Sequence, residues 1–200
     1  MSILAIGTAM EATPALANIS TKAMLRSCAL SGIDTDKLLS DVGIDRRMIE
    51  LVDGRIPLQQ VFALSAEARK RTGDSAFALH AAEALPFGAY GIIDYLAITS
   101  STPREGLIMA ARYFGLITTA FNLVPELRNR DALVELRQSN SQALPGHYAE
   151  YVLASLLVRF RFTTGVPWRP REVRLSSPTP QDQSEYQRIL PRSTSASSVS

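Results

Sequence analysis

The spacing of apolar residues over roughly the first 85 positions is typical of short helices packed on one another. Residues 55–74 show it best, because Leu58, Val61, Phe62 and Leu64 form an apolar stripe at helical spacing. Glycines close several segments, as expected at helix C-termini. Ser20 and Asp74 are predicted N-caps. The pattern predicts helices over 21–32, 33–43, 44–54, 55–74 and 74–85.

The pattern changes after residue 100. Residues 101–118 predict a helix capped by Ser101 or Thr102, with Pro103 in its first turn. Alternation of apolar and polar residues in 119–140 predicts a hairpin that turns at 129–131 and buries one face. Three further elements are predicted: a long, largely buried helix over 146–165, a strand over 168–178 with Val173 and Leu175 inward, and a helix over 179–190.

These elements predict an α+β fold, in which an N-terminal helical part precedes a small antiparallel sheet packed against a long helix. We expect one effector-sensing or dimerisation domain over 16–190, helical in 16–85 and α+β in 86–190. Residues 1–15 are expected to form a flexible leader. Residues 191–200 are rich in serine and cannot build a core, so we expect them to be disordered.

The stretch 84–103 combines apolar residues, glycines and tyrosines with a single carboxylate, Asp94. Glycine permits close approach of the backbone, and tyrosine joins an apolar body to a polar tip, which suits a small-molecule site. Asp94 must face solvent, pair with Arg104 or Arg112, or meet a cationic ligand. The same stretch could instead be core. The candidate ligand-binding residues are Phe87, Gly88, Tyr90, Asp94, Tyr95, Tyr113, His147 and Tyr151.

Charge and composition argue against several classes of protein. A formal net charge of +2 is weak for a nucleic-acid binder, and acidic Asp34 and Asp36 begin the second helix of the one segment that resembles a helix–turn–helix. One cysteine, Cys28, excludes an internal disulfide, and no residues have metal-ligand spacing. The apolar run at 151–158 is too short to cross a membrane. We expect a cytoplasmic protein without metal or cofactor.

No sequence motif of catalysis is present, so no catalytic residue is predicted. His147 and Glu150 share a face of the long predicted helix and could form a base and its partner, but a hydrogen bond from His147 to a loop or water explains the pattern as well. His80 is expected to be a partly exposed helix residue. Cys28 is expected to be a buried thiol.

Several segments together carry a resemblance to a known family. They include "RIPL" with "TGD", then "GAYGIIDY" followed by "SSTPRE", and "WRPREV". From about Met24 to Leu190 the chain resembles the N-terminal effector domain of AraC-type bacterial transcriptional regulators, and in particular the group that contains ornithine- and virulence-regulon activators.

The resemblance implies a domain that senses a small effector of unknown class and forms a homodimer. DNA would be contacted only through a C-terminal helix–turn–helix domain. After "EYQRIL" the sequence departs from the family, which predicts a truncated regulator, whether by nature, by a frameshift or by excision. The alternatives are a dimerisation module that binds no ligand and a small enzyme that uses His147 and Glu150.

Overall fold

The structure, a computed structural model, describes residues 14–129, 131–139, 145–175 and 183–190. The predicted tail over 191–200, and residues 1–13 of the predicted leader, lie outside these residues. The elements run in the order β1 (Ala15–Ala17), α1 (Ile19–Leu30), α2 (Thr35–Asp41), α3 (Arg46–Glu50), β2 (Arg55–Pro57), α4 (Leu58–Thr72), α5 (Phe77–Ala84), α6 (Ile92–Thr99), α7 (Pro103–Tyr113), the 3-10 helix η1 (Phe114–Leu116), β3 (Phe121–Leu127), β4 (Ala132–Gln138), α8 (Gly146–Thr164) and α9 (Ser184–Ile189).

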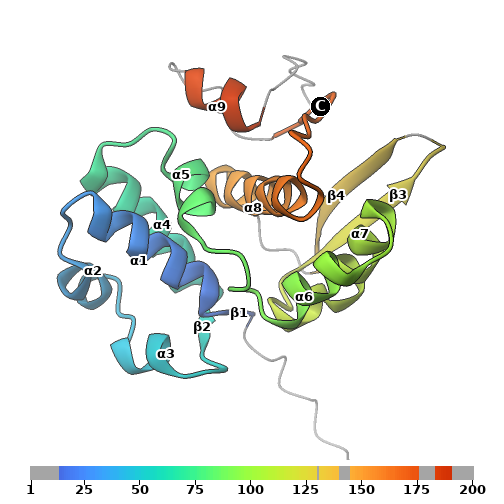
Figure 1. Cartoon of the computed structure of the whole chain (residues 1–200). Coiled ribbons are helices and arrows are strands. Elements are labelled where there is room, and N and C mark those ends of the chain that lie inside the picture. The colour runs from blue at the N-terminus through green and yellow to red at the C-terminus, as the bar shows by residue number, and fades with distance from the viewer. Residues whose placement is uncertain (1–13, 130, 140–144, 176–182, 191–200) are drawn as a thin grey trace, which may run out of the picture.

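Helix α8 lies at the centre of the fold (Figure 1). The helices α1 to α5 lie on one side of it, while α6, α7 and the β3–β4 hairpin lie on the other, and α9 lies above α5 and α8. Burial along α8 is therefore not confined to one face: Tyr148, Glu150 and Val152, which point in different directions around the helix, are all buried. This arrangement confirms the predicted α+β class and the long, largely buried helix.

The hairpin is also confirmed. β3 pairs antiparallel with β4, with Leu127 opposite Ala132 next to the turn. Phe121 and Leu123 are buried on one face of β3, and Val134 and Leu136 of β4 pack against the core. The turn is closed by a hydrogen bond from the Arg128 N–H to the Asp131 carbonyl at 2.8 Å.

Two short strands in the helical part were not predicted. Ala15 pairs with Pro57 and Ala17 with Arg55, so β1 and β2 form a small antiparallel sheet. At three residues each, these strands are too short for an alternating pattern to be recognised. They tie the start of the described chain to the beginning of α4.

Two predicted N-caps are corrected. Helix α1 begins at Ile19 after Asn18, and Ser20 is buried, where its hydroxyl accepts a hydrogen bond from the Tyr148 hydroxyl at 3.3 Å. Helix α5 begins after Ala76, and Asp74 instead accepts from the Ala76 N–H at 2.9 Å. In both places a polar side chain has a tertiary or turn partner that local sequence does not reveal.

The predicted strand over 168–178 is wrong in its described part, because residues 168–175 form no strand. Pro167 and Pro170 lack the N–H that a sheet ladder needs, and the Trp168 carbonyl accepts from the Arg161 side chain at 2.9 Å. Val173 is nevertheless buried, as the apolar pattern predicted, and Leu175 packs against the core.

Candidate functional site

A buried ion pair joins α6 to α8. Asp94, in the first turn of α6, is 1% exposed, and Arg159 of α8 is 7% exposed. The Arg159 Nε–H donates to Asp94 Oδ1 at 2.9 Å. Asp94 Oδ2 accepts from the backbone N–H groups of Gly88 at 2.8 Å and Tyr90 at 3.0 Å. One carboxylate therefore holds the loop before α6 and the central helix together.

The partners predicted for Asp94 are corrected by this geometry. Arg104 donates to the backbone carbonyl of Arg128 at 2.8 Å, near the hairpin turn. Arg112 lies over the ring of Tyr113, 5.7 Å from its centroid. The true partner, Arg159, is 65 residues from Asp94 in the sequence. A sequence signal for it exists: Arg159 is a charged residue that follows the apolar run 151–158 on a buried helix.

The Arg159 side chain contacts one tyrosine, and the hydroxyl of that tyrosine lies close to the hydroxyl of a second. The guanidinium carbon of Arg159 lies 4.1 Å from the centroid of the Tyr90 ring, within the range of a cation–π contact. The Tyr90 and Tyr151 hydroxyls are 3.3 Å apart. Burial raises the pKa of Tyr151 well above its usual value, so its hydroxyl stays protonated. The site therefore places the Tyr90 ring against one buried cation, with the protonated hydroxyl of Tyr151 next to that of Tyr90.

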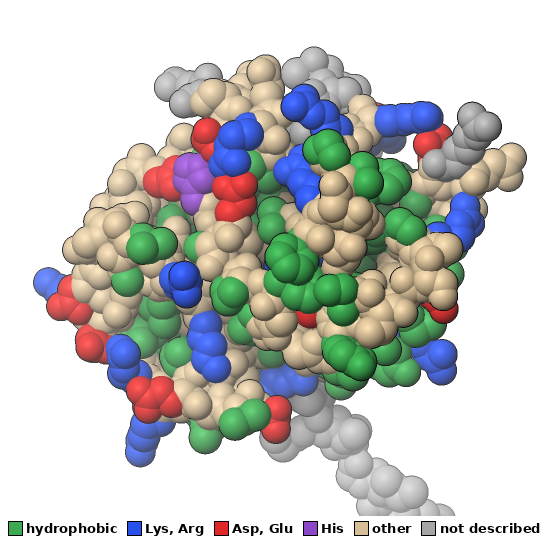
Figure 2. All heavy atoms as spheres, in the orientation of Figure 1, with side chains coloured by type: hydrophobic (Ala, Val, Ile, Leu, Met, Phe, Trp, Pro, Cys, Tyr) green, Lys and Arg blue, Asp and Glu red, His purple; other side chains and the backbone are tan. Residues whose placement is uncertain are grey.

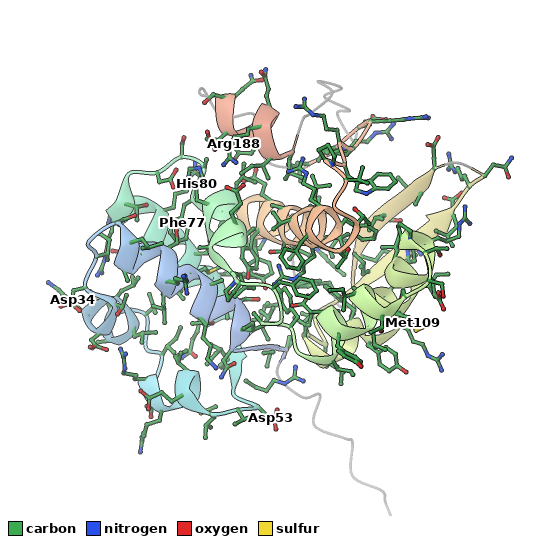
Figure 3. The ribbon with its side chains drawn as sticks, viewed as in Figure 1. Asp34, Asp53, Phe77, His80, Met109 and Arg188 are labelled. Carbon is green, nitrogen blue, oxygen red and sulfur yellow. The ribbon has the colours of Figure 1, made fainter. Side chains whose placement is uncertain are left out.

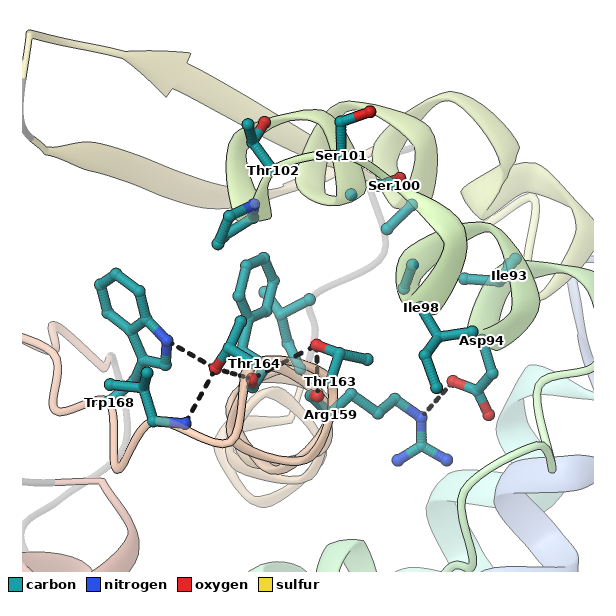
Figure 4. Close-up of a pocket in the computed structure, with 17 residues that line it drawn as sticks. Ile93, Asp94, Ile98, Ser100, Ser101, Thr102, Arg159, Thr163, Thr164 and Trp168 are labelled. Atoms are coloured by element: carbon teal, nitrogen blue, oxygen red, sulfur yellow. Dashed lines mark hydrogen bonds and ion pairs between the residues drawn. The ribbon is translucent and has the colours of Figure 1, made fainter.

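An outer cleft of about 360 Å³ opens between α6, α7 and the end of α8 (Figure 4). Its walls combine apolar side chains with hydroxyl groups from two segments. Asp94 and Arg159 lie at its inner end, and Trp168 and Thr164 at its other end, joined by a hydrogen bond from the indole N–H at 2.8 Å. The polar lining includes Ser100, Ser101, Thr102, Thr163 and Thr164.

A second, smaller space of about 50 Å³, the inner pocket, is lined by the same arginine. Its lining is mostly apolar and comes from α6, α7, η1, β3 and α8, with Ser20, Tyr90 and Ile117 added from other segments. The outer cleft and the inner pocket share Ile93, Ala110, Leu156 and Arg159. Arg159 therefore belongs to the lining of both spaces.

Three of the predicted site residues line these spaces: Tyr90, Asp94 and Tyr151. The lining of neither space includes the other five, Phe87, Gly88, Tyr95, Tyr113 and His147. Phe87 stacks on Phe162 with ring centroids 4.3 Å apart. Gly88 contributes only its backbone N–H to Asp94, and Tyr95 is 62% exposed on α6. Tyr113 lies beneath Arg112.

His147 lies in the first turn of α8. Burial lowers its pKa below the usual value, against the opposing charge of Glu150. Glu150 is buried and accepts a hydrogen bond from the Tyr186 hydroxyl at 2.7 Å, which attaches α9 to the central helix. Glu150 thus has a structural partner that sequence analysis did not anticipate.

Cys28 is buried as predicted, and burial raises the pKa of its thiol to about 11.

His80 lies where α5 meets α9, close to Arg188 (Figure 3), and acidic and basic side chains gather around a histidine on this face (Figure 2). Its Nδ1 is 2.6 Å from Asp74 Oδ2, and its Nε2 is 3.1 Å from Glu185 Oε2. Burial lowers the pKa of His80, but its hydrogen bonds to Asp74 and Glu185 outweigh that effect, so the pKa lies above its usual value.

We expect this cluster to stabilise the fold more at low pH. The contribution of His80 should be complete below about pH 6.5, its unfolded pKa, and should be lost as the pH rises through the higher folded pKa. Urea unfolding of the wild type and of His80→Gln should differ more at pH 6 than at pH 8.5. His147→Gln is the control, because the lowered pKa of His147 gives a contribution of opposite sign. An equal difference at both pH values for His80→Gln would contradict this assignment.

Within the described ranges, no helix is long and apolar enough to span a membrane. In the same part of the chain, no cluster of three or more histidine, cysteine, aspartate or glutamate side chains is arranged to hold a metal ion.

Comparison with known proteins supplies a family context for this geometry. Residues 32–196 match the family described as the arabinose-binding domain of AraC transcription regulators, N-terminal. The sequence is also 24% identical, over 172 residues, to an ornithine utilization regulator of Pseudomonas aeruginosa. That alignment covers 84% of this chain and 50% of the relative, so the chain spans about half the relative's length. These matches confirm the resemblance to AraC-type regulators, a family of regulators rather than of enzymes.

Proposed function

The chain belongs to the family of N-terminal arabinose-binding domains of AraC transcription regulators, and on that premise we propose that it binds a small-molecule effector around Arg159. The observation that carries the proposal is that Arg159, held by Asp94 in a buried ion pair, lines both the outer cleft and the inner pocket. A mostly apolar space with a few convergent polar groups is the usual form of a ligand site. Tyr90, Asp94 and Tyr151, together with Arg159, are the proposed ligand-binding residues.

The same position suggests how binding would act on the rest of a regulator. The walls of the two spaces come from α6, α7 and β3 on one side and from α8 on the other. A ligand that contacts both sides would favour one arrangement of α6 and α7 against α8. An effector can shift a conformational equilibrium only by as much as its affinity differs between the two states. In this proposal the domain itself senses the effector and DNA contact belongs to a separate helix–turn–helix domain.

Leu156→Trp tests the proposal by filling space without removing a polar group. Leu156 lines both the outer cleft and the inner pocket. A ligand at 100 times its dissociation constant adds about 2.7 kcal/mol, which corresponds to a rise of about 5–10 °C in Tm at this size. We expect a thermal-shift screen of the wild type to find such a compound and Leu156→Trp to lose the shift.

The panel should contain sugars, amino acids, aliphatic acids and aromatic acids, with L-arabinose and L-ornithine included because the family and the relative are named for them. Leu157→Trp is the matched control: Leu157 is the next residue of α8, similarly half-buried, and lines neither space. A compound that shifts both variants as much as the wild type binds elsewhere. A panel without a single shift would overturn the proposal.

Self-association is a second candidate function, favoured by exposed apolar side chains on α6. Ile92 and Tyr95 lie three residues apart on the exposed face of this helix, and apolar side chains gather on the α6 and α7 side of the molecule (Figure 2). Exposed apolar patches commonly mark interfaces. We propose a homodimer that buries this face.

Tyr95→Glu should weaken such a dimer by placing a charge in its interface. Sedimentation velocity of the wild type should show a dimer. The dissociation constant of the dimer should be at least tenfold higher for the variant. Leu30→Glu is the control, since Leu30 is also exposed but lies on α1. A wild type that stays monomeric at high concentration would rule this interface out.

A further inference from the structure

Two polar side chains in the inner pocket have donors without a protein partner. Ser155 is 3% exposed, and its hydroxyl has no hydrogen-bond partner within the part of the chain that the structure describes. Arg159 uses Nε–H for Asp94, and Nη2 makes one long contact of 3.4 Å to the Pro86 carbonyl. No described residue accepts a hydrogen bond from its Nη1. Of these donors the Ser155 hydroxyl is the buried one, and buried donors are rarely left unpaired, because losing water without a replacement is unfavourable.

The charge on Arg159 is only partly balanced by Asp94. The Asp94 carboxylate also accepts from two backbone N–H groups and lies in the first turn of α6, where the helix dipole favours a negative charge. The Asp94 carboxylate is therefore stabilised by these backbone N–H groups and the helix dipole as well as by the Arg159 guanidinium. The remaining N–H groups of Arg159 point away from Thr163, Thr164 and Trp168 (Figure 4), and its guanidinium covers Tyr90, a residue of the inner pocket.

Ser155 and Arg159 lie four residues apart on α8, so their side chains occupy neighbouring places on one helix face. Both line the inner pocket. A planar guanidinium with free N–H groups matches the two oxygens of a carboxylate, and a nearby hydroxyl adds a further donor. The unpaired donors therefore match the acceptors of an anionic group.

The rest of the inner pocket limits what can accompany this anion. Phe114, Phe121 and Leu123 supply an apolar wall, and the tyrosine hydroxyls at 3.3 Å already contact each other. A single water needs about 10–15 Å³ on the same measure, so a pocket of 50 Å³ holds roughly four groups of that size. A second charged group on the ligand would lose its hydration against this wall. The several hydroxyl groups of a sugar would likewise lose their hydration against it.

We propose that the effector is a short aliphatic monocarboxylate, whose carboxylate is received by Arg159 and Ser155 and whose short apolar body occupies the rest of the inner pocket. This inference rests on the proposed function and specifies its ligand class. Isovalerate, a small branched member of this class with one negative charge, is the probe. Its amide, isovaleramide, has nearly the same shape without the charge, and so isolates the contribution of the carboxylate.

Isothermal titration of the full chain with sodium isovalerate and with isovaleramide tests the class. We expect the acid to bind at least tenfold more tightly than the amide. Ser155→Ala should weaken isovalerate about tenfold, because a hydrogen bond to a charged group is lost. The same variant should keep or raise the Tm of the free protein, since it removes an unpaired buried hydroxyl. Arg159→Lys retains the charge but loses the planar fork, and should weaken the acid by more than tenfold.

Thr21→Val is the matched control. The Thr21 hydroxyl is also buried and unpaired among the described residues, but Thr21 lines neither space. This variant should match Ser155→Ala in stability and leave isovalerate binding unchanged. A loss of affinity equal in Thr21→Val and Ser155→Ala would remove the role of Ser155.

The outcomes separate this inference from the proposed function. Equal binding of acid and amide overturns the carboxylate class. The carboxylate class is also overturned if isovalerate does not bind but another panel compound does. If Leu156→Trp abolishes the binding of that compound, the proposed effector site still stands. If no compound of the whole panel binds, the proposed function fails and this inference fails with it.

Discussion

Arg159→Met is expected to lower the free energy of unfolding by about 3–5 kcal/mol. The substitution removes the ion-pair partner of Asp94, whose side chain is 1% exposed, and leaves a buried carboxylate with only backbone N–H groups as donors. Methionine keeps much of the apolar stem, so the loss reports mainly on the unbalanced charge. Urea unfolding at pH 7 measures the change.

A double-mutant cycle shows whether the pair itself is responsible. Asp94→Asn combined with Arg159→Met should be less destabilised than the sum of the single variants, because no charge is left unpaired. Arg137→Met is the matched surface control: its partner Glu135 lies 2.8 Å away, but both side chains are exposed, and such pairs contribute about 0–1 kcal/mol. Additive effects of the two buried substitutions would show that Asp94 and Arg159 act independently.

Gly54→Ala is expected to destabilise the fold by about 3 kcal/mol, at the upper end of the range for an overpacked core. Asn18, next to the start of α1, donates its side-chain amide to the carbonyls of Met48 at 3.1 Å and Leu51 at 2.7 Å. The Asn18 N–H also donates to the Gly54 carbonyl at 2.8 Å. A Cβ at position 54 would overlap the Met48 carbonyl oxygen and lie 2.5 Å from the Asn18 amide nitrogen.

Gly115→Ala is the control for this substitution. A Cβ there meets no atom within 4 Å, so the change should stay within about 0.5 kcal/mol. Thermal and urea unfolding of both variants give the comparison. If the two alanines have equal effects, the close approach at Gly54 does not constrain the fold.

Gly54 also shows where local patterns mislead. The sequence predicted that this glycine ends a helix over 44–54, but α3 ends at Glu50, and Gly54 is buried where two backbone segments meet. Gly73 and Gly165, in contrast, end α4 and α8 in the left-handed conformation. Glycine thus serves both to end a helix and to let two backbone segments approach closely, and only the neighbours of each glycine in space show which role it has.

The candidate site was also predictable only in part from the sequence. Glycines, tyrosines and one carboxylate in 84–103 indicated either a pocket or core, and Tyr90 and Asp94 do line the spaces around Arg159. Tyr95 came from the same pattern and is exposed, because it faces away from α8. Arg159 and Ser155 were missed: a charge just after the apolar run 151–158 was a signal for Arg159, but nothing local shows which distant carboxylate it meets.

The sequence by itself determined the helices with clear apolar spacing, the hairpin, the long central helix and the α+β class. Each of these depends on periodicity and capping within a few residues, which act locally along the chain. The tertiary structure alone decided that Asp94 pairs with Arg159, that Ser20 meets Tyr148 and that Glu185 reaches His80. These contacts join residues 65, 128 and 105 positions apart, and they depend on how whole elements pack around α8.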